Sequence, residues 1–162
     1  MIYLLLGTDM GDREANLSRA RELLGQRLGA LAQETRDGGP GERCGESGKL
    51  SVQLRCSEVI ETAAIGFDGP AFLNQTVAFD GDFEPYELLR CCQAIEVEMG
   101  RAPHKARFDE AGRRIYEPRI IDIDILHLNG VVMDEPELTI PHRQVFQRPF
   151  VLGLMQQAAA KR

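Results

Sequence analysis

Two aspartates in a short apolar run carry the strongest chemical signal in the sequence. Asp122 and Asp124 alternate with isoleucines in the segment 120–128, which has the pattern of a β-strand. Because side chains alternate along a strand, we expect both carboxylates on one face and the isoleucines on the other. Neighbouring carboxylates repel unless a cation lies between them, and hard oxygen ligands of this kind suit magnesium.

The segment before these aspartates is basic in an otherwise acidic chain. Residues 101–119 hold six basic and three acidic side chains, whereas the whole chain has 19 basic and 25 acidic residues and a net charge of −6. Two aspartates with this spacing, taken alone, are more often solvated side chains on an exposed strand face. The arginines beside them favour a phosphoryl-transfer site instead, because that reaction requires metal-binding carboxylates next to arginines. The acidic net charge argues against general nucleic-acid binding.

Two further segments place polar side chains at defined positions. Residues 72–80 alternate as a strand does, so that Phe72 and Asn74 lie on the face opposite to Leu73. In the helix that follows, Gln93 and Glu96 are three residues apart and share one flank.

Six elements must position these residues. The sequence predicts strands at 2–6, 52–56, 72–80 and 120–128, a first helix after Asp12 and a second from Pro85 to Met99. Residues 35–49 contain several glycines and no apolar period, and we expect a loop there. This order predicts an α+β fold with both helices on one face of an antiparallel sheet and the other face open to a ligand.

Length and composition set the wider frame. A chain of 162 residues is the size of one domain, and none of its apolar runs approaches the roughly 20 residues that span a bilayer. Its four cysteines form no Cys-x-x-Cys pair, which favours free thiols in a reducing compartment over a zinc site or a disulfide framework. We therefore expect one domain over residues 1–162 that is cytoplasmic, monomeric and independent of membranes and nucleic acids.

The sequence resembles a known enzyme family. The run Pro118-Arg119-Ile120-Ile121-Asp122-Ile123-Asp124-Ile125-Leu126 is similar to the signature of the 6-hydroxymethyl-7,8-dihydropterin pyrophosphokinases of folate biosynthesis. Four more segments follow the family's order and approximate spacing: Phe72-Leu73-Asn74, Glu96 with Gly100-Arg101, Thr139-Ile140-Pro141-His142, and Arg148-Pro149-Phe150. The resemblance extends from Gly7 to about Leu152. It implies the family's ferredoxin-like β-α-β-β-α-β sheet with long active-site loops.

The resemblance also implies a reaction and a role for individual residues. The reaction is transfer of pyrophosphate from ATP to the reduced pterin, which gives AMP and the pterin diphosphate. Two magnesium ions would be held by Asp122 and Asp124, and these two residues with Arg101 and Arg119 would form the catalytic group. The implied ATP-binding residues are Gln93, Glu96, Arg101, Arg119, Thr139, His142 and Arg148. The implied pterin-binding residues are Phe72, Asn74, Phe150 and Arg148, with the two aromatic rings enclosing the pterin.

The chain departs from the family pattern in several places. The link at 35–49 is longer than usual, and we expect it to lie outside the site, while the segment 102–116 is also longer and lacks the family's Trp. Gly7-Thr8-Asp9 stands where Gly-Ser-Asn is usual, and we expect this change to lie outside the site. Pro103 replaces a basic residue, which leaves open which member of the basic segment contacts phosphate: Lys105, Arg107, Arg113 or Arg114.

Two other functions would fit part of the pattern. A metal-dependent nucleotidyl-transferring or cyclising enzyme on a similar sheet would need the paired aspartates but not Phe72, Asn74 and Phe150. An RNA-binding module of the same topology would be basic and would carry a Lys/Arg-Gly-Phe/Tyr type of strand, which this sequence lacks.

Overall fold

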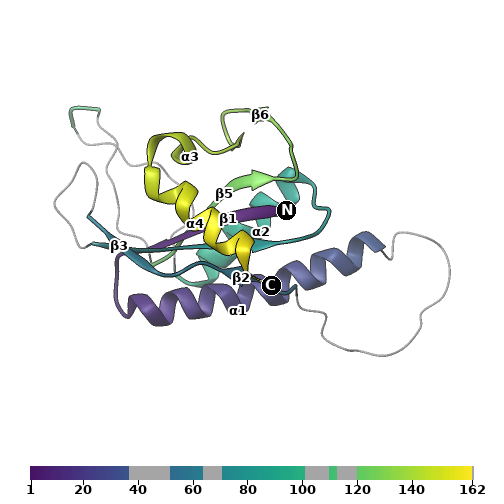
Figure 1. The fold of residues 1–162 in the computed structure, drawn as a ribbon, viewed down its shortest axis with the longest axis horizontal. Coiled ribbons are helices and arrows are strands. Elements are labelled where there is room, and N and C mark those ends of the chain that lie inside the picture. The colour runs from purple at the N-terminus through teal and green to yellow at the C-terminus, as the bar shows by residue number, and fades with distance from the viewer. Residues whose placement is uncertain (37–51, 64–70, 101–109, 113–119, 162) are drawn as a thin grey trace.

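An open antiparallel sheet organises the fold (Figure 1). The computed structural model describes residues 1–36, 52–63, 71–100, 110–112 and 120–161. The elements in chain order are β1 (Ile2–Thr8), α1 (Arg13–Arg36), β2 (Arg55–Cys56), β3 (Ile60–Thr62), β4 (Phe72–Phe79), α2 (Pro85–Glu98), β5 (Asp122–Leu128), β6 (Met133–Asp134), β7 (Thr139–Ile140), α3 (Gln144–Gln147) and α4 (Pro149–Ala160). The main sheet has the order β2-β4-β1-β5, with β3 also paired to β4, while β6 pairs with β7 separately. The mixture of helices with an antiparallel sheet is the α+β class that the sequence predicts.

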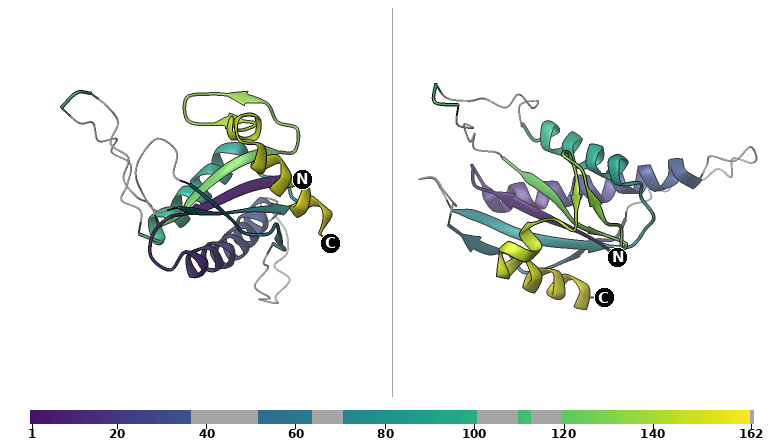
Figure 2. Two further views of the ribbon diagram at one scale, coloured as in Figure 1. Left: turned by 60° about the vertical axis from the view of Figure 1, so that its left-hand side comes forward. Right: turned by 90° about the horizontal axis from the view of Figure 1, so that it is seen from above.

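The two long helices cover one face of the sheet. Figure 2 shows α1 and α2 on the same side of the strands. The first helix begins after Asp12, whose Oδ1 accepts a hydrogen bond from the Ala15 N–H at 3.1 Å, as its position in the sequence predicts. The apolar stripes of both helices form one core with alternate strand residues, among them Leu4, Val77 and Ile125. Full burial of each such side chain contributes about 1.5–3 kcal/mol.

Glu84 caps the N-terminus of α2, the helix that packs against β5. Its carboxylate accepts hydrogen bonds from the backbone N–H groups of Tyr86 and Glu87 at 3.2 and 2.9 Å. At the other end, Gly100 has a φ of +107°, a conformation that strains any residue with a side chain. The helix begins at Pro85 as predicted and ends at Glu98, one residue before the predicted Met99, which is the C-cap.

Replacing Glu84 with alanine is expected to lower the free energy of unfolding by about 1 kcal/mol, because two N–H groups of the first turn lose their acceptor. Urea denaturation of the Glu84→Ala variant measures this loss. Asp82→Ala is the matched control, since Asp82 is an exposed acid that lies before the helix. Equal stability of the two variants would contradict the capping role.

The opposite face of the sheet is only half open, which corrects the expectation that it is free for a ligand. The C-terminal helix α4 lies on that side of the sheet (Figure 2). Leu5 of β1 and Leu126 of β5 form a second core with the helix residues Val151, Leu154 and Met155. The remaining half, near the end of β1 and the start of β5, is left for polar side chains.

Several short elements differ from the prediction. Alternation at 52–56 predicts a strand, but only Arg55 and Cys56 form β2, although Val52 and Leu54 still pack against the main core. The first helix extends to Arg36, two residues into the predicted loop, and the rest of that loop lies outside the described residues. The strands β3, β6 and β7 have two or three residues each, too few to show a period, while α3 and α4 occupy a tail in which only motifs stand out.

Cys56, Cys91 and Cys92 are free thiols. Burial raises the pKa of each of the three thiols, most strongly for Cys92, which is fully buried in the main core. Among the residues described, no helix is both long and apolar enough to cross a membrane.

Candidate active site

The register of three strands sets a carboxylate, a glycine and an amide in one row. Gly7 of β1 pairs with Asp122 of β5 on one side and with Asn74 of β4 on the other. Neighbouring strands are about 4.8 Å apart, so Asp122 and Asn74 stand roughly 10 Å from each other with no side chain between them. A Cβ at Gly7 would lie 3.5 Å from Asn74 Oδ1, so the amide oxygen faces this gap. Gly7, the residue of Gly7-Thr8-Asp9 that follows the usual family pattern, therefore lies at the candidate site.

A hydrogen bond to the neighbouring strand orients the Asn74 amide. Its Nδ2 donates to Thr62 Oγ1 of β3 at 2.7 Å, and the Asn74 side chain is buried. Phe72, which pairs with Thr62 in the register, is half-buried on the same face. Sequence reasoning does not identify Thr62, because the three-residue strand that carries it shows no periodic pattern.

The second aspartate belongs to a chain of contacts that reaches an aromatic ring. Gln144 Nε2 donates to Asp124 Oδ2 at 3.0 Å, and Arg148 Nη1 donates to Gln144 Oε1 at 3.2 Å. The guanidinium carbon of Arg148 lies 4.5 Å from the centroid of the Phe150 ring, a cation–π contact. Asp124 is thus connected through Gln144 to Arg148 and Phe150, which lie more than 20 residues later in the sequence. No motif indicates Gln144.

Glu96 points from α2 toward the strand that carries both aspartates. It is buried, and its Oε1 accepts a hydrogen bond from the Ile123 N–H at 2.9 Å. Ile123 lies between Asp122 and Asp124, so this contact ties the helix to the backbone at the paired carboxylates. Glu96 and Asp124 both raise the pKa of the Cys92 thiol, although burial is the largest cause.

A cavity of about 210 Å³ adjoins Asp124, the second of the paired carboxylates. Its walls combine apolar side chains with a hydroxyl, an imidazole and charged groups, contributed by Leu89, Ile123, Asp124, Ile125, Pro136, Glu137, Leu138, Thr139, His142 and Arg143. Three of the predicted site residues, Asp124, Thr139 and His142, thus share one hollow. Gln93 is half-buried one helical turn after Leu89, which forms part of the α2 wall.

The backbone defines the tautomer of His142. The Gln144 N–H donates to His142 Nδ1 at 3.2 Å. Because a backbone N–H can only donate, Nδ1 is the acceptor and the proton of the neutral ring is on Nε2. His142 therefore has an N–H donor on the ring nitrogen remote from the backbone.

The two aspartates fit a magnesium site. They are two residues apart on one strand face and half-buried, and together they supply oxygen ligands only. In the part of the chain that the structure describes, no cluster of three or more potential metal-ligating side chains occurs. Magnesium is typically held by one or two carboxylates and completes its shell with water and substrate phosphates, so this small donor set suits it.

The predicted phosphate-binding arginines cannot be placed. Arg101 and Arg119 lie outside the described residues, as do the four alternatives in the basic segment: Lys105, Arg107, Arg113 and Arg114. Their assignment stays a prediction from sequence.

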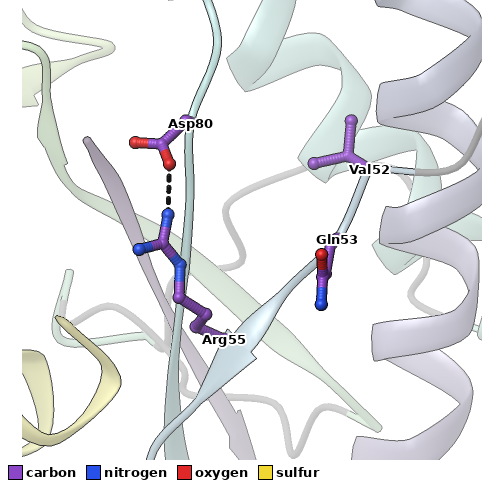
Figure 3. A pocket seen from close by; sticks show the side chains of 4 residues that line it. All are labelled: Val52, Gln53, Arg55 and Asp80. Atoms are coloured by element: carbon purple, nitrogen blue, oxygen red, sulfur yellow. Dashed lines mark hydrogen bonds and ion pairs between the residues drawn. The ribbon is translucent and has the colours of Figure 1, made fainter. Parts of the chain in front are cut away.

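A second hollow, of about 410 Å³, lies at the far edge of the sheet (Figure 3). It is lined by Val52, Gln53, Arg55 and Asp80. Arg55 Nη2 donates to Asp80 Oδ2, so the two charges already satisfy each other. Because β2 pairs with the C-terminal half of β4, this hollow is remote from Asn74 and the carboxylates.

Comparison with known proteins accords with this geometry. The family model described as 7,8-dihydro-6-hydroxymethylpterin-pyrophosphokinase matches residues 3–160. The chain belongs to this family. The resemblance inferred from the motifs is therefore confirmed, and the match includes every residue placed above in the row and in the cavity.

Curated relatives in the pyrophosphokinase family cover nearly the whole chain. A 2-amino-4-hydroxy-6-hydroxymethyldihydropteridine pyrophosphokinase of Porphyromonas gingivalis is 36% identical over 153 residues, which are 93% of this chain and 85% of the relative. The protein of the same name from Bacillus subtilis is 30% identical over 152 residues, 93% of this chain and 73% of that relative. In Pisum sativum, a mitochondrial folate synthesis bifunctional protein is 31% identical over 154 residues, 94% of this chain but only 24% of the relative.

Proposed function

We propose that Asp122 and Asp124 bind two magnesium ions and the ATP phosphates at one end of the row, while Asn74 binds the pterin at the other. The reaction itself follows from the family: the chain is an ATP-dependent pyrophosphokinase that transfers pyrophosphate to 6-hydroxymethyl-7,8-dihydropterin in folate biosynthesis. The gap above Gly7 is the observation that supports separate sites for the two substrates. It separates the Asp122 carboxylate from the Asn74 amide by roughly 10 Å.

The paired aspartates would hold the metal by one or both oxygens of each carboxylate. Bound magnesium neutralises charge on the phosphates and aligns the transferred group. The protein prepares this end of the site through Glu96, which holds the backbone between the two aspartates, and through Gln144, which holds Asp124. Both contacts reduce the reorganisation needed when the substrate arrives.

The pterin end would be formed by Phe72, Asn74, Phe150 and Arg148. Thr62 orients the Asn74 amide so that its oxygen can accept from an N–H on the edge of the ring. Aromatic side chains suit the faces of a flat heterocycle, and the guanidinium over Phe150 adds a charge next to that ring.

The nucleotide would enter the cavity beside β5 and β7. Its apolar walls, which include Leu89 and Leu138, suit a purine base, and Thr139 with the Nε2–H of His142 can bind polar groups of the ribose or phosphates. Gln93 of α2 and Arg148, which follows α3, would also contact the nucleotide. Arg101 and Arg119 are assigned to the phosphates from charge and sequence position alone.

Broader features of the chain are also proposed. The strand order β2-β4-β1-β5 with α1 and α2 on one face supports the ferredoxin-like topology, and the family match over 3–160 supports one domain spanning 1–162. Free thiols at Cys56, Cys91 and Cys92 are compatible with a cytoplasmic location. The acidic net charge supports the absence of nucleic-acid partners, and we propose a monomer.

The two alternative functions are not favoured by the comparisons. The relatives are named as pyrophosphokinases or folate synthesis proteins, neither as nucleotidyl-transferring or cyclising enzymes nor as RNA-binding modules.

The direct test is incubation of the chain with ATP, magnesium and 6-hydroxymethyl-7,8-dihydropterin, followed by detection of AMP. We expect AMP to form only when both the pterin and magnesium are present. AMP release that does not depend on the pterin would overturn the proposed function. Release of pyrophosphate in place of AMP would favour the nucleotidyl-transferring or cyclising alternative.

The contact from Thr62 to Asn74 gives a prediction for pterin affinity. Thr62→Val keeps the shape of the side chain but removes the acceptor, so pterin binding is expected to weaken by about 0.5–1.5 kcal/mol while nucleotide binding is unchanged. Thr62→Ser, which keeps the hydroxyl, should bind pterin normally. Calorimetry with each ligand measures both, and unchanged pterin affinity in Thr62→Val would contradict the orienting role.

A further inference from the structure

We propose that Gln144 is a positioning residue that keeps the guanidinium of Arg148 away from the carboxylate of Asp124, so that this arginine does not compete with a divalent cation for the carboxylate. This inference rests on the proposed magnesium site. It concerns a residue for which neither the sequence motifs nor the comparisons supply a role.

The contacts of Gln144 make it a neutral spacer between opposite charges. Its amide donates through Nε2 to Asp124 Oδ2 and accepts through Oε1 from Arg148 Nη1. The charges on the two sides dictate this orientation, because the reversed amide would set an N–H group against the guanidinium and an oxygen against the carboxylate. Two hydrogen bonds and the width of one amide place Asp124 and Arg148 within roughly 9 Å of each other.

The position of Gln144 is itself well determined. It is the first residue of α3, and its side chain reaches Asp124 of β5. Its N–H donates to His142 Nδ1, and the His142 N–H donates to Leu126 O at 2.9 Å. The backbone of Gln144 is therefore fixed relative to β5, the strand that carries Asp124. Arg148, four residues later, lies one helical turn away.

Without the spacer, the flexible arginine is expected to pair with the aspartate. Asp124 already acts on Arg148, since it raises the pKa of the guanidinium, although burial lowers that pKa more. A direct ion pair would occupy the carboxylate oxygen that a cation needs, and it would draw the guanidinium off the Phe150 ring. Groups that orient a metal ligand commonly change metal affinity by about 10–100-fold when removed.

The test measures Mn²⁺ binding in the presence of α,β-methylene-ATP. The electron paramagnetic resonance signal gives the concentration of free Mn²⁺. Gln144→Met keeps the length of the side chain and removes both hydrogen bonds. We expect its Mn²⁺ dissociation constant to rise about tenfold or more. Gln147→Met is the matched control, because Gln147 lies on the same short helix and is exposed, and its Mn²⁺ binding should equal that of the unaltered chain.

A double-variant cycle separates the spacer role from a general structural one. If Gln144 acts by holding Arg148 away, Gln144→Met should shift Mn²⁺ binding by less than about twofold once Arg148 is replaced by methionine. A tenfold shift that persists in the Arg148→Met background would overturn the proposal, because the damage would then not depend on the arginine. Unchanged binding in the single variant Gln144→Met would overturn it as well.

The same titration distinguishes failure of the inference from failure of the proposed function. If the unaltered chain takes up no more Mn²⁺ than the nucleotide analogue alone, the metal site is wrong and the spacer role falls with it. If the unaltered chain binds Mn²⁺ and Gln144→Met binds it equally well, the metal site stands and only the role of Gln144 is overturned.

Discussion

Asp122→Asn and Asp124→Asn are each expected to lower kcat by at least about 10²–10³-fold while the chain stays folded. Each substitution removes a charged oxygen ligand from the polar face of β5, whereas the isoleucines on the other face remain buried in the main core. Asparagine at 124 can still accept the hydrogen bond from Gln144. Removal of one of two adjacent like charges should leave the melting temperature of the metal-free chain unchanged or slightly raised.

The measurement combines the rate of AMP formation at saturating substrates with a thermal melt. Asp134→Asn is the matched control, because Asp134 is exposed on β6 and its replacement should leave the rate unchanged. Near-normal activity of either β5 variant at ordinary magnesium concentration would show that the metal assignment is wrong. A large drop in melting temperature would show instead that the carboxylate is structural.

Asn74→Ala and Arg119→Ala are expected to have opposite effects on the two substrates. Asn74 lies on β4, on the far side of Gly7 from Asp122, so its loss should weaken pterin binding by about 1–3 kcal/mol and leave nucleotide binding almost intact. Arg119→Ala should spare pterin binding and lower the single-turnover rate by about 10²–10³-fold, because its charge is needed most when the transferred group develops its own.

Calorimetry with each ligand alone and single-turnover kinetics together measure this division. Gln156→Ala and Arg90→Ala serve as controls for the amide and the guanidinium, since both residues are exposed on helices. Equal weakening of ATP and pterin binding by Asn74→Ala would mean that the row does not separate the two substrates. A normal single-turnover rate in Arg119→Ala would transfer its role to another member of the basic segment.

The long elements and the paired carboxylates could be predicted because each depends on a local period. Alternation in residues 122–128 determines which side chains face the helices, and it correctly places Ile123 and Ile125 in the core with Asp122 and Asp124 on the other face. Capping preference in the same way predicts the N-cap at Asp12, and the helical period predicts the buried stripe of α2. Motif spacing was sufficient for the family, which the comparisons confirm.

Strand register decided what no local pattern contains. Only the pairing of three strands shows that Gly7 separates Asp122 from Asn74, because register depends on hydrogen bonds between segments more than 40 residues apart. For the same reason the place of Gly7 between these two side chains could not be predicted from the sequence. Thr62 gains a role only because β3 pairs with the start of β4.

The sequence by itself determined the chemical groups of this protein: two carboxylates on one strand face, aromatic and amide side chains on another strand, and the family that uses them. Tertiary structure alone decided how they are held, with α4 covering half of the ligand face and Gln144 between Asp124 and Arg148. The physical reason is one of range. Periodicity and capping act over a few residues, whereas a hydrogen bond between side chains 20 residues apart leaves no periodic trace in the sequence.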